Sequence, residues 1–581
     1  MTSEAAAAQA PAVTSRPATG SARLRRGAIA AVVLLLALPS VVLLAGRVYQ
    51  PASDWALMEL RTRDVFTTNP PLIGAYSRYG WAHPGPLPYY LLAVPYQLLG
   101  GGAGALLWAA LLLNVVMVAA VLWVAGRTSP AAMVGASALT AAVVRTATLP
   151  MVMHDPWNAS LVVLPFLLLM VCCWCALGGD DRAALVGAFA YLFVVQAHVG
   201  FAVVATPLFA ITAGWVWRGR RRRQARMSPR SRSAVAALAA VAALLVLPVL
   251  VDTLANWPGN AGRLVRWSLT EQPTPAAGWG ASGRIMLRAS SLSYITELRL
   301  PVFVNVLETP MGGGLLPGTC LVLLVAAGLW AYRSGHAGAR NAATCLAVLW
   351  ASVAISIANL RGPLLEWLFG WLAPVVWATW LTIACVGWLA LRSLLQQASA
   401  RLWADRVAAA SAVVVVAACG VAQIGRVSDE PVEWQRVGAA SVVLAAAAQD
   451  VADGAPIRLG YDGDTPDAVH LMAGVLNVLD RGGVRVQVPD DWALLAGGHR
   501  VAPLEGAVEL RVSQQAVAAE HEGWQVISVY DEADPTTRAE VDALTRELSQ
   551  VLVEIGRDDL VPALSTAGAD IVLAAEPDPA L

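Results

Sequence analysis

The sequence predicts an α-helical polytopic membrane protein with an α/β domain at its C-terminus. Hydrophobic residues make up 57% of the 581-residue chain and charged residues only 14%, a composition typical of a protein with many membrane spans. From about residue 426 the chain becomes rich in Asp and Glu and has no further spanning run. The formal net charge of zero says nothing useful about partners, and no nucleic acid is expected among them.

A helix that crosses a bilayer needs about 20 mainly apolar residues. By this criterion the transmembrane domain covers residues 27–425, and residues 1–26 before it are predicted to be a disordered cytoplasmic segment. The eleven predicted spans are 27–46, 103–126, 130–149, 159–178, 183–198, 199–217, 234–254, 314–332, 341–358, 368–391 and 407–425.

The distribution of Arg predicts the orientation, because basic residues collect in short cytoplasmic connections. Alternate connections hold Arg127, Arg182, the block Arg218–Arg232, Arg333 with Arg340, and Arg392 with Arg401 and Arg406. The N-terminus is therefore predicted to be cytoplasmic and the C-terminus external. One external face then carries the connections 47–102, 150–158, 255–313 and 359–367 together with the tail.

The tail, residues 426–581, alternates helical and strand-like patterns. This alternation predicts a small α/β domain on the external face. Its expected helices are 432–453, 466–480 and 535–556, the last begun by Asp534 and Pro535, and its expected strands are 457–464, 484–489, 507–513 and 524–530.

The most polar interruption of the apolar chain is Asp54–Leu91, directly after the first span. Asp54 is close enough to the span to face a lipid headgroup and remain hydrated enough to ionise. Glu59, Arg63 and Asp64 follow at helical spacing, and a surface salt bridge explains the Glu59/Arg63 pair well. A salt bridge explains the presence of Asp54 less well, because no obvious cation lies three or four residues further on.

The later part of this loop changes character at Pro88. Its prolines and glycines forbid a continuous helix up to that residue, whereas the segment from Tyr89 to Leu99 is aromatic on one side and apolar on the other. This segment is predicted to be a helix in the outer membrane interface.

The other external connections add further candidates. His154 and Asp155 could bind a divalent cation, Mg²⁺ or Mn²⁺, or a phosphate, and a turn in which Asp155-Pro156 caps the next helix is an equally good interpretation. His198 lies at membrane depth, where polar residues tend to be functional, although a bond to a neighbouring helix would also explain it. Arg263 lies in an interfacial segment whose Trp257 and Trp267 suit membrane anchoring.

Four segments together resemble GT-C type glycosyltransferases, the polytopic enzymes that take sugars from polyprenyl-phosphate carriers, and especially an actinobacterial subgroup. The resemblance covers about the first 400 residues. It implies loop helices that run along the membrane surface and a first acidic residue that serves as catalytic base or metal ligand. The matching segments are Asp54 with Glu59, GAYSRYGWAHPGP (74–86), PWN (156–158) and QAHVGF (196–201).

The chemistry of such a transfer assigns roles to these residues. A hydroxyl that attacks an anomeric carbon needs a carboxylate to accept its proton, and Asp54 is the predicted base, with Glu59 as its catalytic neighbour. Glu59 or Asp64 could instead orient the acceptor hydroxyls. The departing phosphate needs positive charge and hydrogen-bond donors. The predicted substrate-binding residues are Asp64, Arg78, Tyr79, His83, His198, Arg263 and Arg361.

The predicted function is an inverting transfer of one hexosyl or pentosyl unit at the outer face of the plasma membrane. The donor would be a polyprenyl-phosphate sugar and the acceptor a cell-envelope glycan, lipid or protein, with membrane lipids as surroundings. The alternative is a non-catalytic scaffold or transporter whose external domain binds an envelope glycan, although the chain has no internal repeat. An acyltransferase ranks last, because the sequence has no Ser-His-Asp ordering and no paired catalytic histidine motif.

Overall fold

The computed structural model describes most of the chain: residues 19–146, 151–222, 229–270, 274–291, 318–395, 398–427, 432–461, 466–514, 524–530, 535–554, 556–557, 561 and 571–575. Parts of the predicted external loop 255–313 and the start of the predicted span 314–332 lie outside these residues. The first helix begins at Thr19, so it includes the end of the segment 1–26 that was predicted to be disordered.

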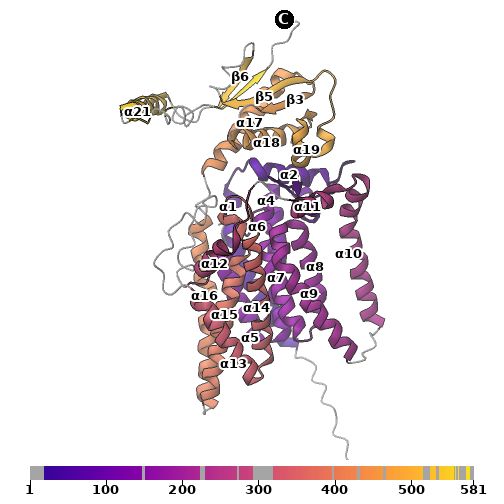
Figure 1. Ribbon diagram of the computed structural model, residues 1–581, viewed down its shortest axis with the longest axis vertical. Coiled ribbons are helices and arrows are strands. Elements are labelled where there is room, and N and C mark those ends of the chain that lie inside the picture. The colour runs from indigo at the N-terminus through magenta and orange to yellow at the C-terminus, as the bar shows by residue number, and fades with distance from the viewer. Residues whose placement is uncertain are drawn as a thin grey trace, which may run out of the picture.

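A bundle of long helices forms the larger part of the molecule (Figure 1). Each predicted span coincides with one of its helices, because a run of apolar residues is a local signal that needs no tertiary information. The helices are α1 (Thr19–Gly46), α4 (Ala105–Thr128), α5 (Pro130–Thr146), α7 (Val163–Leu177), α8 (Asp181–Ala197), α9 (Val199–Arg222), α10 (Pro229–Ala255), α13 (Thr319–Ser334), α14 (Ala337–Ala358), α15 (Leu372–Leu394) and α16 (Ala398–Val427).

Six helices in the described part of the chain are long and apolar enough to cross a membrane. The number becomes seven if α10 and α11 (Gly259–Leu269), which meet at a bend of 78°, count as one broken span. Shorter apolar helices such as α5 and α13 accompany them. A membrane protein is thus confirmed, and the total of eleven spans stays a prediction.

Short elements gather at one end of the bundle, where Figure 1 shows α2 and α11 beneath the C-terminal domain. The predicted helix from Tyr89 is confirmed as α3, which begins two residues earlier. The elements are α2 (Ser53–Asp64), the hairpin of β1 (Tyr76–Ser77) and β2 (Trp81–Ala82), α3 (Leu87–Leu98), α6 (Asn158–Leu161), α11, α12 (Gly278–Ala289) and the 3₁₀ helix η2 (Glu366–Phe369).

The C-terminal domain is a five-stranded mixed sheet with helices on the side that faces the bundle (Figure 1). β3 (Ile457–Tyr461) pairs in parallel with β4 (Val486–Gln487) and with β5 (Val508–Gln514). β7 (Ile571–Ala575) lies between β5 and β6 (Gln525–Tyr530) and is antiparallel to both. The predicted strands are confirmed, and β7 is an addition that the five-residue run IVLAA did not reveal.

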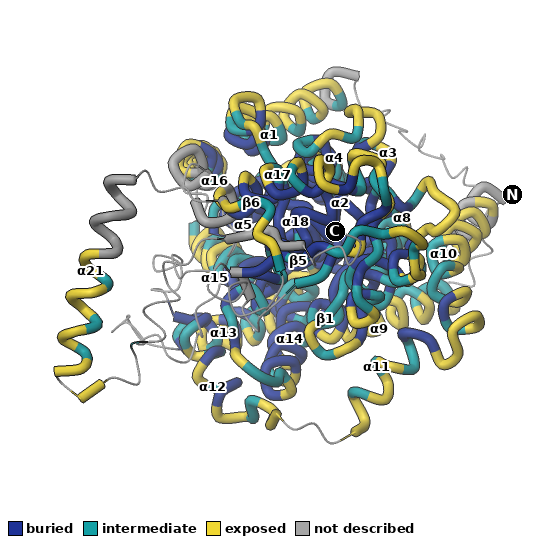
Figure 2. The backbone as a smooth tube through the Cα atoms, turned by 90° about the horizontal axis from the view of Figure 1, so that it is seen from above, coloured by how far each residue is buried: buried dark blue, intermediate teal, exposed yellow. Residues whose placement is uncertain are grey.

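The predicted helices of this domain are also confirmed, as α17 (Val432–Ala452), α18 (Pro466–Arg481) and α21 (Pro535–Glu554). α17 and α18 lie between the sheet and the bundle, whereas α21 stands to the side in both views (Figures 1 and 2). The view from above places α2 and α18 near the centre of the molecule, among buried segments (Figure 2). The short helix α19 (Ala493–Ala496) follows β4.

The loop helix α2 belongs to the hydrophobic core of the C-terminal domain. Its side chains Ala56, Leu57 and Leu60 are buried in one cluster with residues of α17, α18 and the sheet. Burying one leucine is worth about 1.5–3 kcal/mol, so this contact is a substantial attachment. Gly438 in α17 lies directly against the backbone carbonyl of Gln50, where a Cβ atom would have no room. The C-terminal domain is therefore packed onto the first loop.

Candidate active site

Asp54 lies in the first turn of α2, at the junction between the bundle and the C-terminal domain. The Tyr76 hydroxyl in β1 donates a 2.6 Å hydrogen bond to Asp54 Oδ1. Burial raises the pKa of Asp54 above its usual range, and the Tyr76 hydrogen bond, the electrostatic effect of His470 and the nearby Trp157 side chain oppose the rise by favouring the ionised form.

The backbone before Asp54 is unusual, because Ser53 has φ of 52°, in the left-handed region. A non-glycine residue there costs of order 1–3 kcal/mol and needs support from its surroundings. The support comes from the C-terminal domain, where the imidazole Nδ1 of His470 in α18 hydrogen-bonds the Ser53 hydroxyl. His470 was not predicted from the sequence, which offers no signal that a residue of the tail would reach this loop.

A second carboxyl group, Asp155, lies next to the same helix. Its Oδ1 accepts hydrogen bonds from the Trp55 indole at 2.7 Å and from the Trp157 backbone N–H at 2.9 Å. Its Oδ2 is buried and has no hydrogen-bond partner among the described residues. Burial raises the pKa of Asp155 to about 6. Trp55, the residue after Asp54, thus connects Asp155 to α2, and the two acids predicted in separate loops lie at one site.

Aromatic rings continue from this pair of acids across the end of the bundle that lies beneath the C-terminal domain. The ring centroids of Trp157 are 5.4 Å from those of Trp55 and 5.2 Å from those of Trp367. The ring centroid of Trp367 lies 6.5 Å from that of His198, and the ring centroids of His198 and His83 are 4.4 Å apart. Trp367 was not predicted as a site residue. It follows the buried Glu366 in η2, and only the fold brings its loop to the other two.

The hydrogen bonds of His83 and His198 fix the position of their protons. His83 Nδ1 accepts the Val199 N–H at 3.2 Å, and His198 Nδ1 accepts the Gly200 N–H at 3.1 Å. Each neutral ring must therefore carry its proton on Nε2. Burial and the neighbouring imidazole lower the pKa of His83 well below its usual range. The pair thus presents two neutral N–H donors side by side.

Tyr79 and two predicted arginines lie beyond this pair. The Tyr79 hydroxyl donates a 2.6 Å hydrogen bond to the Arg361 carbonyl, and the Arg78 guanidinium lies over the Tyr79 ring, 5.2 Å from its centroid. The Arg361 guanidinium donates to the Thr274 carbonyl at 2.8 Å. Trp267 in α11 lies 5.2 Å from Tyr79. The hairpin thus gathers both arginines next to the aromatic rings.

Helix α11 is attached to the hairpin through Asn260. Its side-chain Oδ1 accepts the Ala82 N–H and its Nδ2 donates to the Ala82 carbonyl, both at 2.8 Å. Arg263 follows one turn later in α11 and is exposed. It lies on the element that carries Trp267. The grouping of the three arginines stays a prediction.

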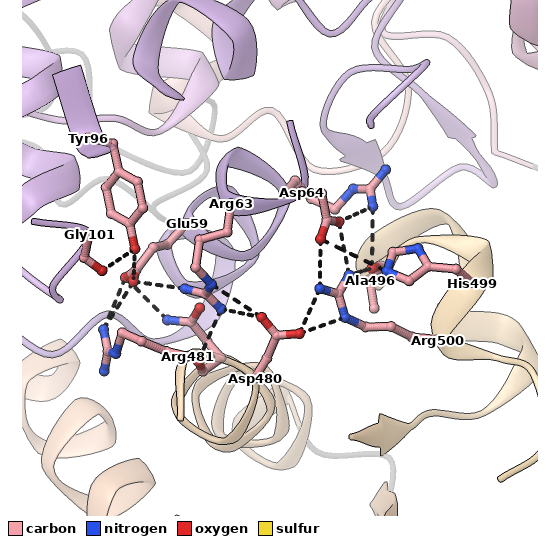
Figure 3. Close-up of polar contacts among 12 residues, drawn as sticks. Glu59, Arg63, Asp64, Tyr96, Gly101, Asp480, Arg481, Ala496, His499 and Arg500 are labelled. Atoms are coloured by element: carbon pink, nitrogen blue, oxygen red, sulfur yellow. Dashed lines mark hydrogen bonds and ion pairs between the residues drawn. The ribbon is translucent and has the colours of Figure 1, made fainter. Parts of the chain in front are cut away.

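Glu59 differs from the acid expected beside Asp54, because its carboxylate is fully buried between α2 and α18. It accepts hydrogen bonds from Arg63 at 2.9 Å, the Tyr96 hydroxyl at 2.9 Å, Asn477 at 3.2 Å and Arg481 at 3.0 Å (Figure 3). The salt bridge between Glu59 and Arg63 is present as predicted. It is not a surface salt bridge, because it lies between α2 and α18. Both oxygens are engaged, and this geometry favours a joint between domains over a contact with substrate.

Asp64 belongs to the same joint. Arg500 bridges two carboxylates, with hydrogen bonds of 2.8 and 2.9 Å to Asp64 and of 2.7 and 3.1 Å to Asp480 (Figure 3). Arg61 adds a 2.6 Å bond to Asp64, and Arg63 a 2.8 Å bond to Asp480. We call this set the interdomain clamp: Glu59, Arg61, Arg63, Asp64, Asp480, Arg481 and Arg500.

His154 points away from Asp155. Its Nδ1 lies 2.8 Å from the Ser40 hydroxyl of α1, and its ring lines a cavity of about 70 Å³ together with Arg47 and Tyr49. Burial and the charge of Arg47 lower the pKa of His154 to about 4. Among the described residues no three His, Cys, Asp or Glu side chains form a metal-binding group. The metal role of His154 and Asp155 stays a prediction, and their separate partners give a cation little support.

Replacing Tyr76 with Phe tests whether Asp54 works as a base. The change removes an O–H that stabilises the ionised carboxylate, so the pKa of Asp54 should rise further. Because a base must be ionised, the acidic limb of the kcat/KM profile should move to higher pH. The Tyr90→Phe variant is the matched control, since the Tyr90 hydroxyl bonds the Pro71 carbonyl instead. If both variants have the same pH profile, the Tyr76 hydrogen bond does not control the reaction rate through the ionisation of Asp54.

Comparison with known proteins extends the observations on the fold. No protein-family model matches the chain, and no curated protein matches it in sequence. ArnT from Cupriavidus metallidurans in the apo state is similar in structure, with a TM-score of 0.50 and 14% identity over 88% of this chain and 96% of ArnT.

Two further structures have lower scores. ArnT from Cupriavidus metallidurans bound to undecaprenyl phosphate has a TM-score of 0.45 and 14% identity over 97% of this chain and 99% of that chain. The oligosaccharyltransferase of Archaeoglobus fulgidus in the apo form has a TM-score of 0.35 and 14% identity over 84% and 69%. At these identities the likeness concerns the fold, and apo ArnT supports it over most of both chains. The predicted resemblance is thereby confirmed at the level of architecture: this protein has the fold of GT-C type glycosyltransferases.

Proposed function

We propose that the protein is an integral membrane glycosyltransferase that moves a sugar from a polyprenyl-phosphate donor to a cell-envelope acceptor. The observation that carries this proposal is Asp54, a partly buried carboxyl group held by a hydrogen bond from Tyr76 where the bundle meets the C-terminal domain. The donor class follows from the sequence resemblance. The sugar and the acceptor are left open.

In this proposal the Asp54 carboxylate accepts the proton of the acceptor hydroxyl as that oxygen attacks the anomeric carbon. A new carbon–oxygen bond forms while the bond from the anomeric carbon to the phosphate oxygen breaks. The electron pair leaves with the polyprenyl phosphate. Attack opposite the leaving group inverts the anomeric configuration.

The histidine pair suits the leaving group in this scheme. Neutral N–H donors that are fixed before the reaction stabilise charge on a departing phosphate at little cost in reorganisation. The Nε2–H groups of His83 and His198 are such donors, and Arg78 and Arg361 supply positive charge nearby. The aromatic rings of Trp157 and Trp367 provide faces on which a sugar could stack between the phosphate and Asp54.

The orientation of the site is also part of the proposal. Helix α2, which carries Asp54, and the C-terminal domain lie at the same end of the bundle (Figure 1). The Arg distribution assigns the opposite end to the cytoplasm. The site would therefore open at the outer face of the plasma membrane, where envelope glycans are assembled.

A transfer assay tests the proposed function. The purified protein in lipid nanodiscs is given a panel of polyprenyl-phosphate sugars with a radiolabelled sugar, and membranes or envelope extract of the source organism as acceptor. Label should move to an acceptor with one donor of the panel. Binding of lipid-linked sugar without transfer for any donor would contradict the proposal and support the scaffold alternative.

Replacing either histidine with Phe should slow the transfer while keeping an aromatic ring in place. Loss of one preorganised donor costs about 10²–10³-fold in rate, so His83→Phe and His198→Phe should each lower kcat by that order. The control is Tyr191→Phe, which removes a hydroxyl bonded to Thr206 at an exposed position. Wild-type kcat for both histidine variants would show that the pair does not act on the leaving group.

A further inference from the structure

The C-terminal domain touches the loop immediately before Asp54. α18 supplies His470, whose Nδ1 bonds the Ser53 hydroxyl, and Gly474 one turn later lies against Ala52. Both contacts come from one face of α18. The tail domain thus covers the three residues, Ala52 to Asp54, in which the chain turns from extended backbone into helix α2.

This turn depends on a conformation that serine does not favour. Ser53 has φ of 52°, and the residue before it is extended, with φ of −128°. The direction of the Asp54 side chain follows from this turn, because Asp54 is the next residue. Within the loop, the Ala56 N–H donates to the Ala52 carbonyl at 3.1 Å. Among the described residues, the one side-chain hydrogen bond of Ser53 is with His470, which comes from outside the loop.

The interdomain clamp and the shared core keep α18 in place for this contact. Glu59 and Asp64, nearly two and about three turns after Ser53, are bound by Arg481 and Arg500 of the C-terminal domain. Leu57 and Leu60 are buried against Leu471 and Leu476 in the same core. Contacts along the whole length of α2 thus fix the position of His470 relative to Ser53. A catalytic group needs such accurate positioning.

We propose that His470 is a positioning residue of the active site, which holds Ser53 through its Nδ1 and thereby aims the Asp54 carboxylate from the C-terminal domain. This inference rests on the proposed role of Asp54. It gives the C-terminal domain a part in the transfer reaction itself. His470 is also close enough to act on the Asp54 carboxylate electrostatically.

Two conservative substitutions of His470 distinguish the effect of its hydrogen bond to Ser53 from the effects of the rest of the imidazole ring. The Asn side chain places a polar atom where His has Nδ1, whereas Gln places one where His has Nε2. His470→Asn should therefore keep kcat within about threefold of the wild type. His470→Gln and His470→Ala should lower kcat by about 10²-fold, the typical cost of a misplaced reacting group, with little change in the donor KM.

A double-mutant cycle and an activity-independent measurement complete the test. Ser53→Ala should resemble His470→Ala, and the double variant should be no slower than either, because both remove one interaction. Hydrogen–deuterium exchange of the peptide covering residues 50–58 should be faster in His470→Gln and His470→Ala and unchanged in His470→Asn. Arg485→Ala, an exposed change in the same domain, is the control and should behave as the wild type.

The outcomes distinguish this inference from the proposed function. Wild-type kcat and exchange in His470→Gln and His470→Ala would overturn the positioning role. Equal loss in His470→Asn and His470→Gln would also overturn it, since the ring would then act otherwise than through Ser53. If the wild-type protein transfers no sugar, the proposed function fails, and the exchange measurement still decides whether His470 holds the turn.

Discussion

The Asp54→Asn variant is expected to lose sugar transfer by about 10²–10⁴-fold, the usual contribution of a positioned general base. The amide oxygen of Asn can still accept the Tyr76 hydrogen bond, so the fold of the first loop should persist. What disappears is the capacity to take the proton of the acceptor hydroxyl. The initial rate of transfer in nanodiscs measures the effect, and the thermal unfolding midpoint checks the fold.

Two further variants sharpen this result. Asp181→Asn changes an exposed carboxylate that pairs with Arg220 at the other end of the bundle, and it should keep the wild-type rate. In Asp155→Asn the amide oxygen can still accept from Trp55 and from the Trp157 backbone, so the loss should be smaller than for Asp54→Asn. The opposite ranking would make Asp155 the base.

The Arg500→Ala variant is expected to loosen the C-terminal domain and to lower activity with it. Arg500 is only 8% exposed and bonds both Asp64 and Asp480, so its removal leaves the buried Asp64 and the partly buried Asp480 each with one arginine fewer. Removing one partner of a buried pair typically costs about 3–5 kcal/mol. Hydrogen–deuterium exchange in α2 and α18 and the unfolding midpoint should both report the change.

The matched control for Arg500 is Arg458→Ala. Arg458 is an arginine of the same domain with a side chain 47% exposed, and its pair with Glu509 is 3.5 Å long. Such exposed pairs contribute only about 0–1 kcal/mol, so this variant should exchange and unfold like the wild type. If Arg500→Ala also leaves exchange in α2 unchanged, the clamp does not hold the two domains together.

The helices of the bundle could be predicted because their signal is local. Apolar runs, the turn-forming prolines after Asn69 and the alternating pattern of the tail each depend on residues close in the chain. The same holds for Asp54 as a candidate, since its place after the first span and its missing cation are both visible in the sequence. Tyr76, 22 residues later, could have been considered as its partner, being a hydroxyl in the same polar stretch.

The interdomain clamp could not be predicted, because its partners lie far apart in the chain. Glu59 and Arg481 are 422 positions apart, and Asp64 and Arg500 are 436 apart, so no pattern within a window connects them. Arg63, four residues after Glu59, already explained the charge of Glu59 as a local salt bridge. The sequence therefore offered no reason to expect further partners. His470 and Trp367 likewise become visible only when the fold brings the tail and the loop 359–367 to the first loop.

The most direct test of the central claim is a comparison of lipids and envelope glycans in three strains of the source organism: a deletion strain, and the same strain complemented with the wild-type gene or with Asp54→Asn. We predict that the deletion strain and the Asp54→Asn strain accumulate one polyprenyl-phosphate sugar and lack the corresponding sugar in one envelope glycan. The wild-type gene should restore both. Unchanged lipids and glycans in the deletion strain, or full restoration by Asp54→Asn, would contradict a glycosyltransferase that uses Asp54 as its base.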